Sequence, residues 1–235
     1  MWNKQTVSIV LPAYNEEKGV GPAVKEFLAT SIPDEVVVVD NNSRDKTSAR
    51  AKAAGGRVVL CKTQGYGAAL TFGLKAAKGD IIVMCEPDGS FVAGDLQKLL
   101  LYLEDFDVVL GTRTSKSMIW SGAKMDWFLR FGNVVVAKLL EYLHNGPCLT
   151  DVGCTFKAMR RPAYKRIAKK LSVTDSRFSP HFMTVCMRSG LSCVEIPVNY
   201  KRRIGESKIT STFWKSFKLG MRMIFMIIGA RFRKV

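Results

Sequence analysis

The chain has 235 residues, and 47% of them are hydrophobic, so it can bury a sizeable core in one large domain, and a disordered chain is excluded. Its 36 lysines and arginines against 20 aspartates and glutamates leave a net charge of +16, which favours an anionic partner: nucleic acid, a phosphorylated small molecule or an anionic membrane surface. The 6 cysteines are scattered, without a C-x-x-C pair or a histidine cluster, which argues against zinc and favours reduced thiols in a cytosolic compartment.

The first half of the chain alternates short apolar runs with segments of helical periodicity. Runs such as VSIVLP and EVVVVD are apolar at successive positions, as in strands that are buried on both faces. The helix-length segments between them predict βαβ units, and therefore a mostly parallel sheet with helices on both sides. The predicted strands occupy residues 7–12, 35–40, 57–61, 80–85 and 107–111.

The pattern changes after about residue 112. A basic stretch is followed by a long amphipathic helix around 124–143 and by a polar loop at 145–153. Two further helical segments and a strand-like run, LSCVEIPVNY, come next. This half therefore continues the fold with fewer predicted strands than the first half has.

The carboxyl ends of the predicted strands read PAYNE, DNNS, EPDG and GTR, and ligands of open α/β sheets bind at such ends. In EPDG, Pro87 stops the strand and Gly89 permits a tight turn, so Glu86 and Asp88 come close together. Two close carboxylates repel each other unless a cation lies between them, and a hard divalent cation that shares its other positions with substrate phosphates meets this need. A solvated turn is the alternative interpretation.

The second predicted strand ends on Asp40 and Asn41, whose side chains could hydrogen-bond a base and a ribose. These side chains, and those of Asn42 and Ser43, are equally suited to capping the helix that follows, because Asn, Asp and Ser favour that position. Both interpretations stay open from the residues alone.

Five blocks of the chain occur in an order and at a spacing that resemble the family 2 glycosyltransferases, over residues 6–113. The blocks are VSIVLPAYNEE, VVVDNNSRDKT, GYGAAL, GDIIVMCEPDGSF and VVLGTR. The resemblance implies an α/β fold of the GT-A type, with a mostly parallel central sheet flanked by helices, and a nucleotide-sugar donor. The implied donor-site residues are Pro12, Ala13, Tyr14, Glu16, Asp40, Asn41, Gly67, Glu86 and Asp88, and the implied ligands of a Mg²⁺ or Mn²⁺ ion on the diphosphate are Asp88 and Glu86.

The chain departs from the family pattern at two acidic positions. Glu86 stands where the D-x-D motif of the family begins, so Asp88 is the firmer of the two expected metal ligands. Asn41 follows Asp40 where the family often has a second aspartate. The identity of the base, guanine or uracil, therefore stays open.

The later blocks most resemble the dolichol-phosphate mannosyltransferases and related polyprenyl-phosphate sugar transferases, and they extend the resemblance to about residue 208. They are GTRTSKSMIWSGAKMDWFLRFGN, LTDVGCTFKAMRR and VNYKRRIGESK. An acceptor that carries a phosphate needs charge-assisted donors. The donors expected here are Arg113, Arg130, Arg202 and Lys208, whereas Arg203 and Lys201 are better interpreted as solvated surface charges.

The expected catalytic residues are Asp88, Asp151, Arg113 and Arg130. A phosphate monoester is ionised at neutral pH, so its attack on the anomeric carbon needs little help from a base, and in-line positioning and stabilisation of the departing diphosphate remain. Asp151 would then orient the acceptor or a basic side chain. With a hydroxyl acceptor it would be the candidate base, and a loop-capping aspartate is the alternative.

The stretch 209–235 is expected to form a basic amphipathic helix, in which Lys215, Lys218 and Arg222 oppose an apolar side. The apolar side carries Phe213, Phe217, Met221, Ile224, Phe225 and Ile228. This pattern is typical of a helix that lies in a membrane interface. The alternatives are a helix packed on the core and a contact with a separate membrane subunit. No run in the sequence reaches the roughly 18 uninterrupted apolar residues of a membrane span, so any membrane contact is expected to be peripheral or to come through a partner.

The sequence thus predicts an inverting glycosyltransferase that moves one hexose, mannose or glucose, from GDP-mannose or UDP-glucose to a polyprenyl phosphate such as dolichyl or undecaprenyl phosphate. Residues 1–208 would form the catalytic domain at the cytoplasmic face of a membrane, with a nucleotide-sugar half at about 1–111 and an acceptor half at about 112–208. The Q-x-x-R-W block of processive synthases is absent from the sequence, so one sugar per encounter is expected. One alternative is a family 2 enzyme that uses a hydroxyl of a glycolipid or a cell-wall glycan, and another is a basic nucleic-acid-binding module, whose interleaved aromatic residues the sequence lacks.

Overall fold

The computed structural model describes residues 1–123, 125, 127–205 and 213–232. Its strands are β1 (Val7–Ala13), β2 (Glu35–Asp40), β3 (Arg57–Leu60), β4 (Ile81–Met84), β5 (Val108–Thr112), β6 (Lys157–Arg160) and β7 (Cys193–Pro197). Its α-helices are α1 (Val20–Ala29), α2 (Thr47–Ala53), α3 (Tyr66–Ala76), α4 (Leu96–Tyr102), α5 (Trp127–His144), α6 (Arg161–Ile167), α7 (Phe178–Arg188) and α8 (Phe213–Phe232). Single 3₁₀ turns occupy Ala93–Asp95, Lys116–Met118 and Ala168–Lys170.

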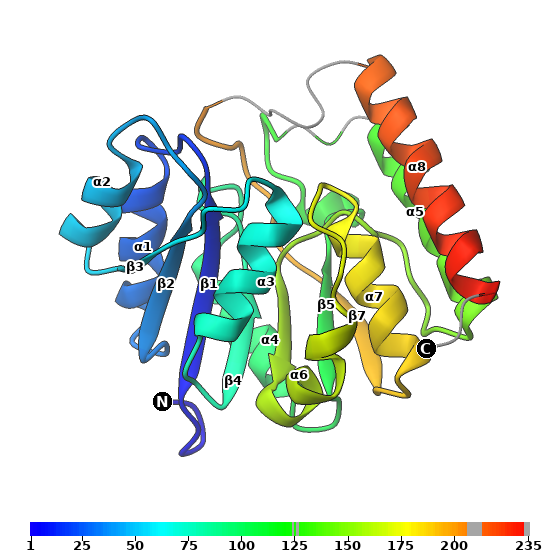
Figure 1. Ribbon diagram of the computed structural model, residues 1–235, viewed down its shortest axis with the longest axis horizontal. Helices are drawn as coiled ribbons and strands as arrows, with labels where there is room; N and C mark the ends of the chain where they lie inside the picture. The colour runs from blue at the N-terminus through cyan, green and yellow to red at the C-terminus, as the bar shows by residue number, and fades with distance from the viewer. Residues whose placement is uncertain (124, 126, 206–212, 233–235) are drawn as a thin grey trace.

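The described strands form one seven-stranded sheet in the order β3-β2-β1-β4-β6-β5-β7. Strand β1 pairs in parallel with β2 and β4, so that Ala13 lies opposite Asp40 and Val10 lies opposite Met84. Strand β6 is antiparallel to both of its neighbours, and β7 is parallel to β5. The carboxyl ends of β1, β2, β4 and β5 therefore share one edge of the sheet (Figure 1). The prediction of a mostly parallel α/β sheet is confirmed.

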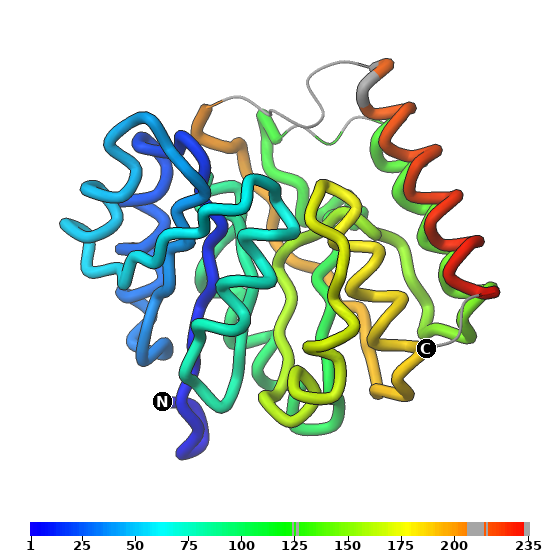
Figure 2. The backbone as a smooth tube through the Cα atoms, in the orientation of Figure 1, coloured from blue at the N-terminus to red at the C-terminus, as the bar shows by residue number. Residues whose placement is uncertain are grey.

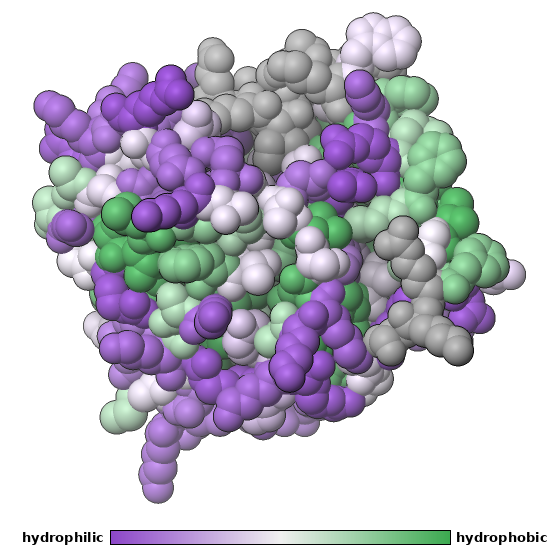
Figure 3. Space-filling model, in the orientation of Figure 1, coloured by the Kyte–Doolittle hydropathy of each residue, from purple (hydrophilic) through white to green (hydrophobic). Residues whose placement is uncertain are grey.

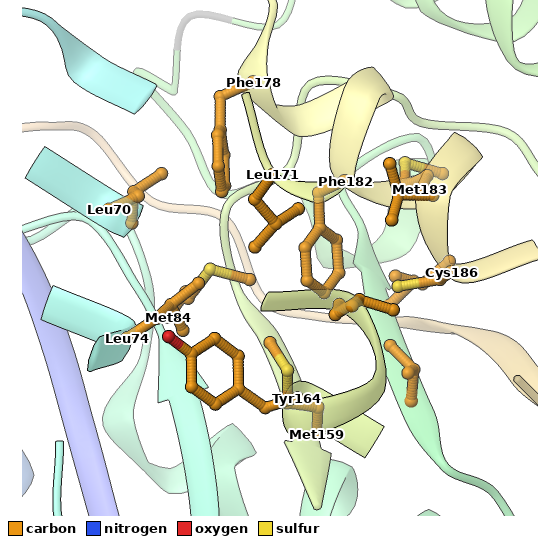
Figure 4. Close-up of a cluster of buried hydrophobic side chains, with 14 of the residues drawn as sticks. Leu70, Leu74, Met84, Met159, Tyr164, Leu171, Phe178, Phe182, Met183 and Cys186 are labelled. Atoms are coloured by element: carbon orange, nitrogen blue, oxygen red, sulfur yellow. The ribbon is translucent and has the colours of Figure 1, made fainter. Parts of the chain in front are cut away.

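Helices cover both faces of this sheet, and each face has its own apolar cluster. On one face, Leu70 of α3 and Phe178 of α7 pack with Met84 of β4, and Figure 4 shows this cluster from within. On the other face, α1, α2 and α4 cover the second cluster. The four consecutive valines of β2 alternate between the two clusters, because successive side chains of a strand point to opposite faces. This alternation explains why the strand sequences are apolar without interruption.

Helix α8 runs beside α5 and also contacts α7 (Figure 1, Figure 2). Its Met223 and Ile227 are buried against the body of the protein. His144 Nε2, at the end of α5, donates a hydrogen bond of 3.2 Å to the carbonyl of Ile227, and Arg188 of α7 donates to the carbonyl of Ala230. These contacts fix α8 to the rest of the fold.

The sequence pattern identified only part of the apolar surface of α8. Met223 and Ile227, which pack inward, were not assigned to the apolar side, whereas Phe217, Phe225 and Ile228 of that predicted side are exposed. The helix therefore packs on the core with one side and keeps a second apolar side outward. The apolar side chains over α5 and α8 are visible at the right of Figure 3. The side chains of Phe213 and Lys215 lie outside the described residues.

Within the described ranges, none of the helices combines the length and the apolar character that crossing a membrane requires.

Glu195 of β7 ties the loop that follows α5 to the sheet. Its carboxylate accepts hydrogen bonds from the backbone N–H of Thr150 at 2.7 Å, from the Thr150 hydroxyl at 2.6 Å and from the N–H of Asp151 at 3.0 Å. Burial raises the pKa of this carboxyl to about 7, the hydrogen bonds from Thr150 and Asp151 oppose the rise, and the charge of Asp151 adds to it. Because the folded pKa lies above the ordinary value of 4.5, the folded chain holds this proton more tightly than the unfolded chain does.

The stability of the wild type should therefore fall, relative to a Glu195→Gln variant, as the pH rises from about 4.5 to about 7, and the difference should be constant at higher pH. The variant lacks this titration, while all other ionisable groups are shared. Thermal unfolding of both proteins by circular dichroism between pH 4.5 and 8.5, at fixed ionic strength, measures the difference. A difference in melting temperature that does not change with pH would contradict a raised pKa at Glu195.

Candidate active site

A cavity of about 550 Å³ opens at the carboxyl edge of the sheet. Its polar part lies at the ends of β1, β4 and β5, and its apolar part lies between α5 and α8. Polar-part residues include Pro12, Ala13, Tyr14, Glu16, Asn41, Glu86, Asp88, Arg113 and Arg203. Apolar-part residues include Met125, Phe128, Val136, Leu219, Met223 and Ile224. Most of the predicted donor-site residues are thus brought together in one cavity.

The turn after β4 has the geometry that its sequence predicts. Gly89 adopts a φ of 72°, a left-handed conformation that favours glycine. Asp88 is only 2% exposed, and its Oδ1 accepts a hydrogen bond of 2.9 Å from the backbone N–H of Ser90. The carboxylate is therefore held at the strand end, on the wall of the cavity.

Glu86 has partners that the sequence did not indicate. Its Oε1 accepts hydrogen bonds from the hydroxyl of Tyr66 at 3.0 Å and from the hydroxyl of Thr155 at 2.7 Å. Burial, and after it the charge of Asp88, raise the pKa of Glu86, although the hydroxyl of Thr155 counteracts them. Two hydroxyls thus support the longer carboxylate that replaces the first aspartate of the D-x-D motif.

Arg203 lies on the acidic turn, and its interpretation as a solvated surface charge is wrong. Its Nη2 is 3.2 Å from Asp88 Oδ2 and 3.6 Å from Glu16 Oε1, and the side chain is 19% exposed. Lys201 is not a free surface charge either, because its Nζ lies 3.0 Å from Glu26. The sequence does not distinguish Arg203 from its neighbour Arg202. The distinction arises because the segment after β7 crosses the turn after β4.

Asp151 orients a basic side chain and also caps its own loop, and both roles were among those predicted for it. Its Oδ2 accepts from Arg113 Nε at 2.8 Å, and its Oδ1 accepts from Arg113 Nη2 at 2.9 Å. Asp151 is fully buried, and its carboxylate also accepts from the backbone N–H groups of Gly153 and Cys154. Burial alone would raise the pKa of Asp151, but the charge and hydrogen bonds of Arg113 lower it overall. Arg113 lines the cavity, and its guanidinium lies 5.3 Å from the ring centre of Tyr200.

The other predicted acceptor cations are placed less closely. Arg130 lies on α5 between two residues that line the cavity, but is itself outside the lining. The exposed side chain of Arg202 packs over Gly122. Lys208 lies outside the described residues. Among the described members of the predicted set, only Arg113 lines the cavity.

Two predicted donor-site residues have structural partners instead of a place on the cavity wall. Asp40 accepts hydrogen bonds from the N–H of Ser43 and the hydroxyl of Ser48. At Gly67, a Cβ atom would lie 2.3 Å from the carbonyl oxygen of Val173, so close packing requires glycine there. Helix capping by Asn42 or Ser43 is not observed, because α2 begins at Thr47.

Asn41 lines the cavity and also fixes the loop after β3. Its amide donates to the carbonyls of Cys61 at 3.0 Å and Thr63 at 2.7 Å, and its oxygen accepts from the N–H of Gly65 at 2.8 Å. The residue that replaces the family's second aspartate therefore positions the loop that leads into α3.

The acidic turn fits a divalent cation that shares its coordination with a ligand. Across the described residues, no three His, Cys, Asp or Glu side chains gather into a metal site. Glu86 and Asp88 face the cavity as a pair, and phosphate oxygens and water commonly complete the coordination of Mg²⁺ at such pairs. Arg203 on Asp88 shows that the turn already binds positive charge. The cavity can thus combine a cation-binding turn, a rigid guanidinium at Arg113 and an apolar groove.

Comparison with known proteins agrees with this arrangement. Residues 8–168 match the family described as glycosyl transferase family 2. An uncharacterized glycosyltransferase of Mycobacterium tuberculosis is 33% identical over 89% of this chain and 96% of its own length. A dolichyl-phosphate hexose transferase of Haloferax volcanii is 28% identical over 97% and 96%, and the human dolichyl-phosphate beta-glucosyltransferase is 26% identical over 96% and 76%.

Solved structures share the fold. Glucosyl-3-phosphoglycerate synthase from Mycobacterium tuberculosis, in complex with Mn²⁺, UDP-glucose and phosphoglyceric acid, superposes with a TM-score of 0.72 at 19% identity, over 99% of this chain and 82% of that chain. The family match covers more than half of the chain and identifies its family. The superposition identifies its fold. The chain belongs to glycosyl transferase family 2 and is a glycosyltransferase of the GT-A fold.

Proposed function

We propose that this enzyme transfers a single hexose, with inversion, from a nucleoside diphosphate sugar to a polyprenyl phosphate, and that it uses Mg²⁺ or Mn²⁺. The observation that carries the proposal is the continuity of the cavity, which joins the acidic turn and Arg113 to an apolar groove between α5 and α8. Relatives named dolichyl-phosphate hexose transferase and dolichyl-phosphate beta-glucosyltransferase support this acceptor class. Neighbours crystallised with UDP-glucose and Mn²⁺, or with UDP and Mg²⁺, support the donor and the cation.

The apolar groove favours a lipid over a small polar acceptor. Phosphoglyceric acid, which is bound in the structural neighbour, has no hydrocarbon chain to bury. Here Phe128 and Val136 of α5 and Leu219 and Ile224 of α8 line the same cavity as Arg113. Burying a prenyl chain against such side chains is favourable by about 25 cal/mol for each Å² of apolar surface removed from water.

In this mechanism Arg113 holds the acceptor phosphate. Asp151 restrains two nitrogens of the guanidinium, so Arg113 offers a fixed positive charge on the wall of the cavity. The phosphate oxygen is already ionised and attacks the anomeric carbon without a protein base. A cation bound at Asp88 and Glu86 would stabilise the negative charge on the departing diphosphate.

The enzyme is proposed to act while docked peripherally on the cytoplasmic face of a membrane. Exposed aromatic residues of α5 and α8 would insert into the interface, and basic residues of α8 would contact anionic lipid. The exposed aromatic residues of the two helices include Trp127, Phe131, Tyr142, Trp214, Phe225 and Phe232. Lys218 and Arg231 supply basic charge on α8, whereas Arg222 is paired with Asp175 at 2.9 Å.

The transfer itself is tested with labelled UDP-glucose or GDP-mannose, a polyprenyl phosphate and Mg²⁺. We expect a chloroform-soluble, acid-labile product, and a rate at least about a hundredfold lower for Asp88→Asn, which weakens the cation site. Asp105→Asn, an exposed carboxylate on the amino-terminal side of β5, is the matched control and should retain the wild-type rate. Formation of only water-soluble product, from phosphoglycerate or a similar acceptor, would overturn the assignment.

The acceptor site is tested by Arg113→Gln. Loss of a charge-assisted contact should raise the KM for polyprenyl phosphate by about tenfold or more and change the KM for the nucleotide sugar little. Steady-state kinetics with a short-chain polyprenyl phosphate measure both constants, and Arg50→Gln, an exposed arginine of α2, is the control. Equal use of polyprenol and polyprenyl phosphate by the wild type would favour the hydroxyl-acceptor alternative, in which Asp151 acts as base.

Membrane docking is tested by cosedimentation with vesicles that contain phosphatidylglycerol. The double variant Phe225→Ser, Phe232→Ser should bind at least about tenfold more weakly, because two exposed rings no longer enter the interface. Phe72→Ser removes an exposed ring from α3, on another surface, and should bind like the wild type. Unchanged binding of the double variant would exclude the α5–α8 surface as the docking site.

A further inference from the structure

We propose that Arg203 is an internal counter-ion of the acidic turn: it neutralises Asp88 in the empty site and moves to the diphosphate when a divalent cation and a nucleotide bind. This inference rests on the proposed use of a nucleoside diphosphate sugar. It assigns to Arg203 a positioning role and makes the binding of the cation and of the nucleotide interdependent.

The position of Arg203 is set by backbone contacts that do not involve its charge. The N–H of Ile204 donates to the carbonyl of Asp88 at 2.8 Å, and the N–H of Lys201 donates to the carbonyl of Ser90 at 2.8 Å. The segment after β7 is thereby attached to the turn after β4 on both sides of Asp88. The guanidinium is consequently held beside the carboxylate that is expected to bind the cation.

The ion pair of Arg203 is incomplete. One nitrogen, Nη2, approaches both carboxylates, at 3.2 Å for Asp88 and 3.6 Å for Glu16. The Nε atom is buried and has no hydrogen-bond acceptor within the part of the chain that the structure describes. A buried donor without an acceptor is unfavourable, and an oxygen of a bound diphosphate would remove that deficit.

Arg113 shows what a fully paired arginine looks like in the same cavity. Its Nε and Nη2 each meet one oxygen of Asp151, so the pair is bidentate, and Asp151 is fully buried. Arg203 makes no such two-point contact with Asp88. The first pair is built to persist, whereas the second can exchange its anion.

The exchange has a thermodynamic consequence. A divalent cation must compete with Arg203 for Asp88 when no nucleotide is present. A diphosphate offers Arg203 a second anion at the same place, so nucleotide binding removes the competition. By linkage, the cation and the nucleotide then raise each other's affinity by the same factor.

The test is Mn²⁺ binding to the full chain, measured by electron paramagnetic resonance of free Mn²⁺ and by calorimetry, with and without UDP or GDP. Arg203→Gln should bind Mn²⁺ alone about tenfold more tightly than the wild type, and should bind the nucleotide in the presence of Mn²⁺ about tenfold more weakly. Arg50→Gln removes the same charge from an exposed position of α2 and should leave the affinity for Mn²⁺ alone within about twofold of the wild type.

Unchanged or weaker binding of Mn²⁺ alone by Arg203→Gln would overturn the inference. If thermal unfolding shows that Arg203→Gln does not fold, Arg203→Lys tests the inference instead. The lysine variant keeps the charge, so its affinity for Mn²⁺ alone should match that of the wild type, while its affinity for the nucleotide should fall. Tighter binding of Mn²⁺ by the lysine variant would contradict competition between Mn²⁺ and the positive charge at position 203. Failure of the wild type to bind UDP or GDP would instead refute the proposed donor, because the effect on Mn²⁺ alone does not require a nucleotide.

Discussion

Two carboxylates that end a buried strand repel each other, and the site is organised around this constraint. Arg203 neutralises Asp88, and two hydroxyls donate to Glu86. These partners come from α3, from the loop before β6 and from the segment after β7. The carboxylates of the acidic turn therefore find their partners only after distant parts of the chain have assembled around it. The sheet order makes that assembly possible, because β6 and β5 separate β4 from β7 by only two strands.

The two arginines of the cavity illustrate how burial and coordination decide what a charge can do. Arg113 is held by a buried aspartate, and the loop of that aspartate is held in turn by Glu195 of β7. Such a chain of contacts supports a fixed electrostatic environment, which costs no reorganisation during a reaction. Arg203 contacts Asp88 through Nη2 alone, so it is suited to exchange this carboxylate for another anion. Fixed and exchangeable positive charges thus serve different steps in one cavity.

The sequence predicted every described strand except β6, and it predicted the acidic turn, because these features are local. Strand β6 was missed because its run, KAMR, has only 4 residues and both of its ends are charged. An apolar run, a proline and a glycine determine the turn around Asp88, whatever lies nearby. The choice between Arg202 and Arg203 depends on how one segment crosses another, and periodicity contains no such information. The outward and inward sides of α8 could not be separated for a similar reason. Both sides are apolar, and only contact with α5 and α7 decides that Met223 and Ile227 are buried.

The distribution of charge also helps to identify the anionic partner of the protein. Within the described polar part of the cavity, Arg113 and Arg203 each face a carboxylate, so the cavity contributes little to the net charge of +16. The excess therefore lies elsewhere on the molecule, where it acts on something larger than a nucleotide sugar. Nucleic acid would need aromatic side chains placed among the basic ones for stacking. The exposed rings of α5 and α8 instead lie on a helical surface beside the mouth of an apolar groove, and that combination suits an anionic bilayer that delivers a lipid phosphate.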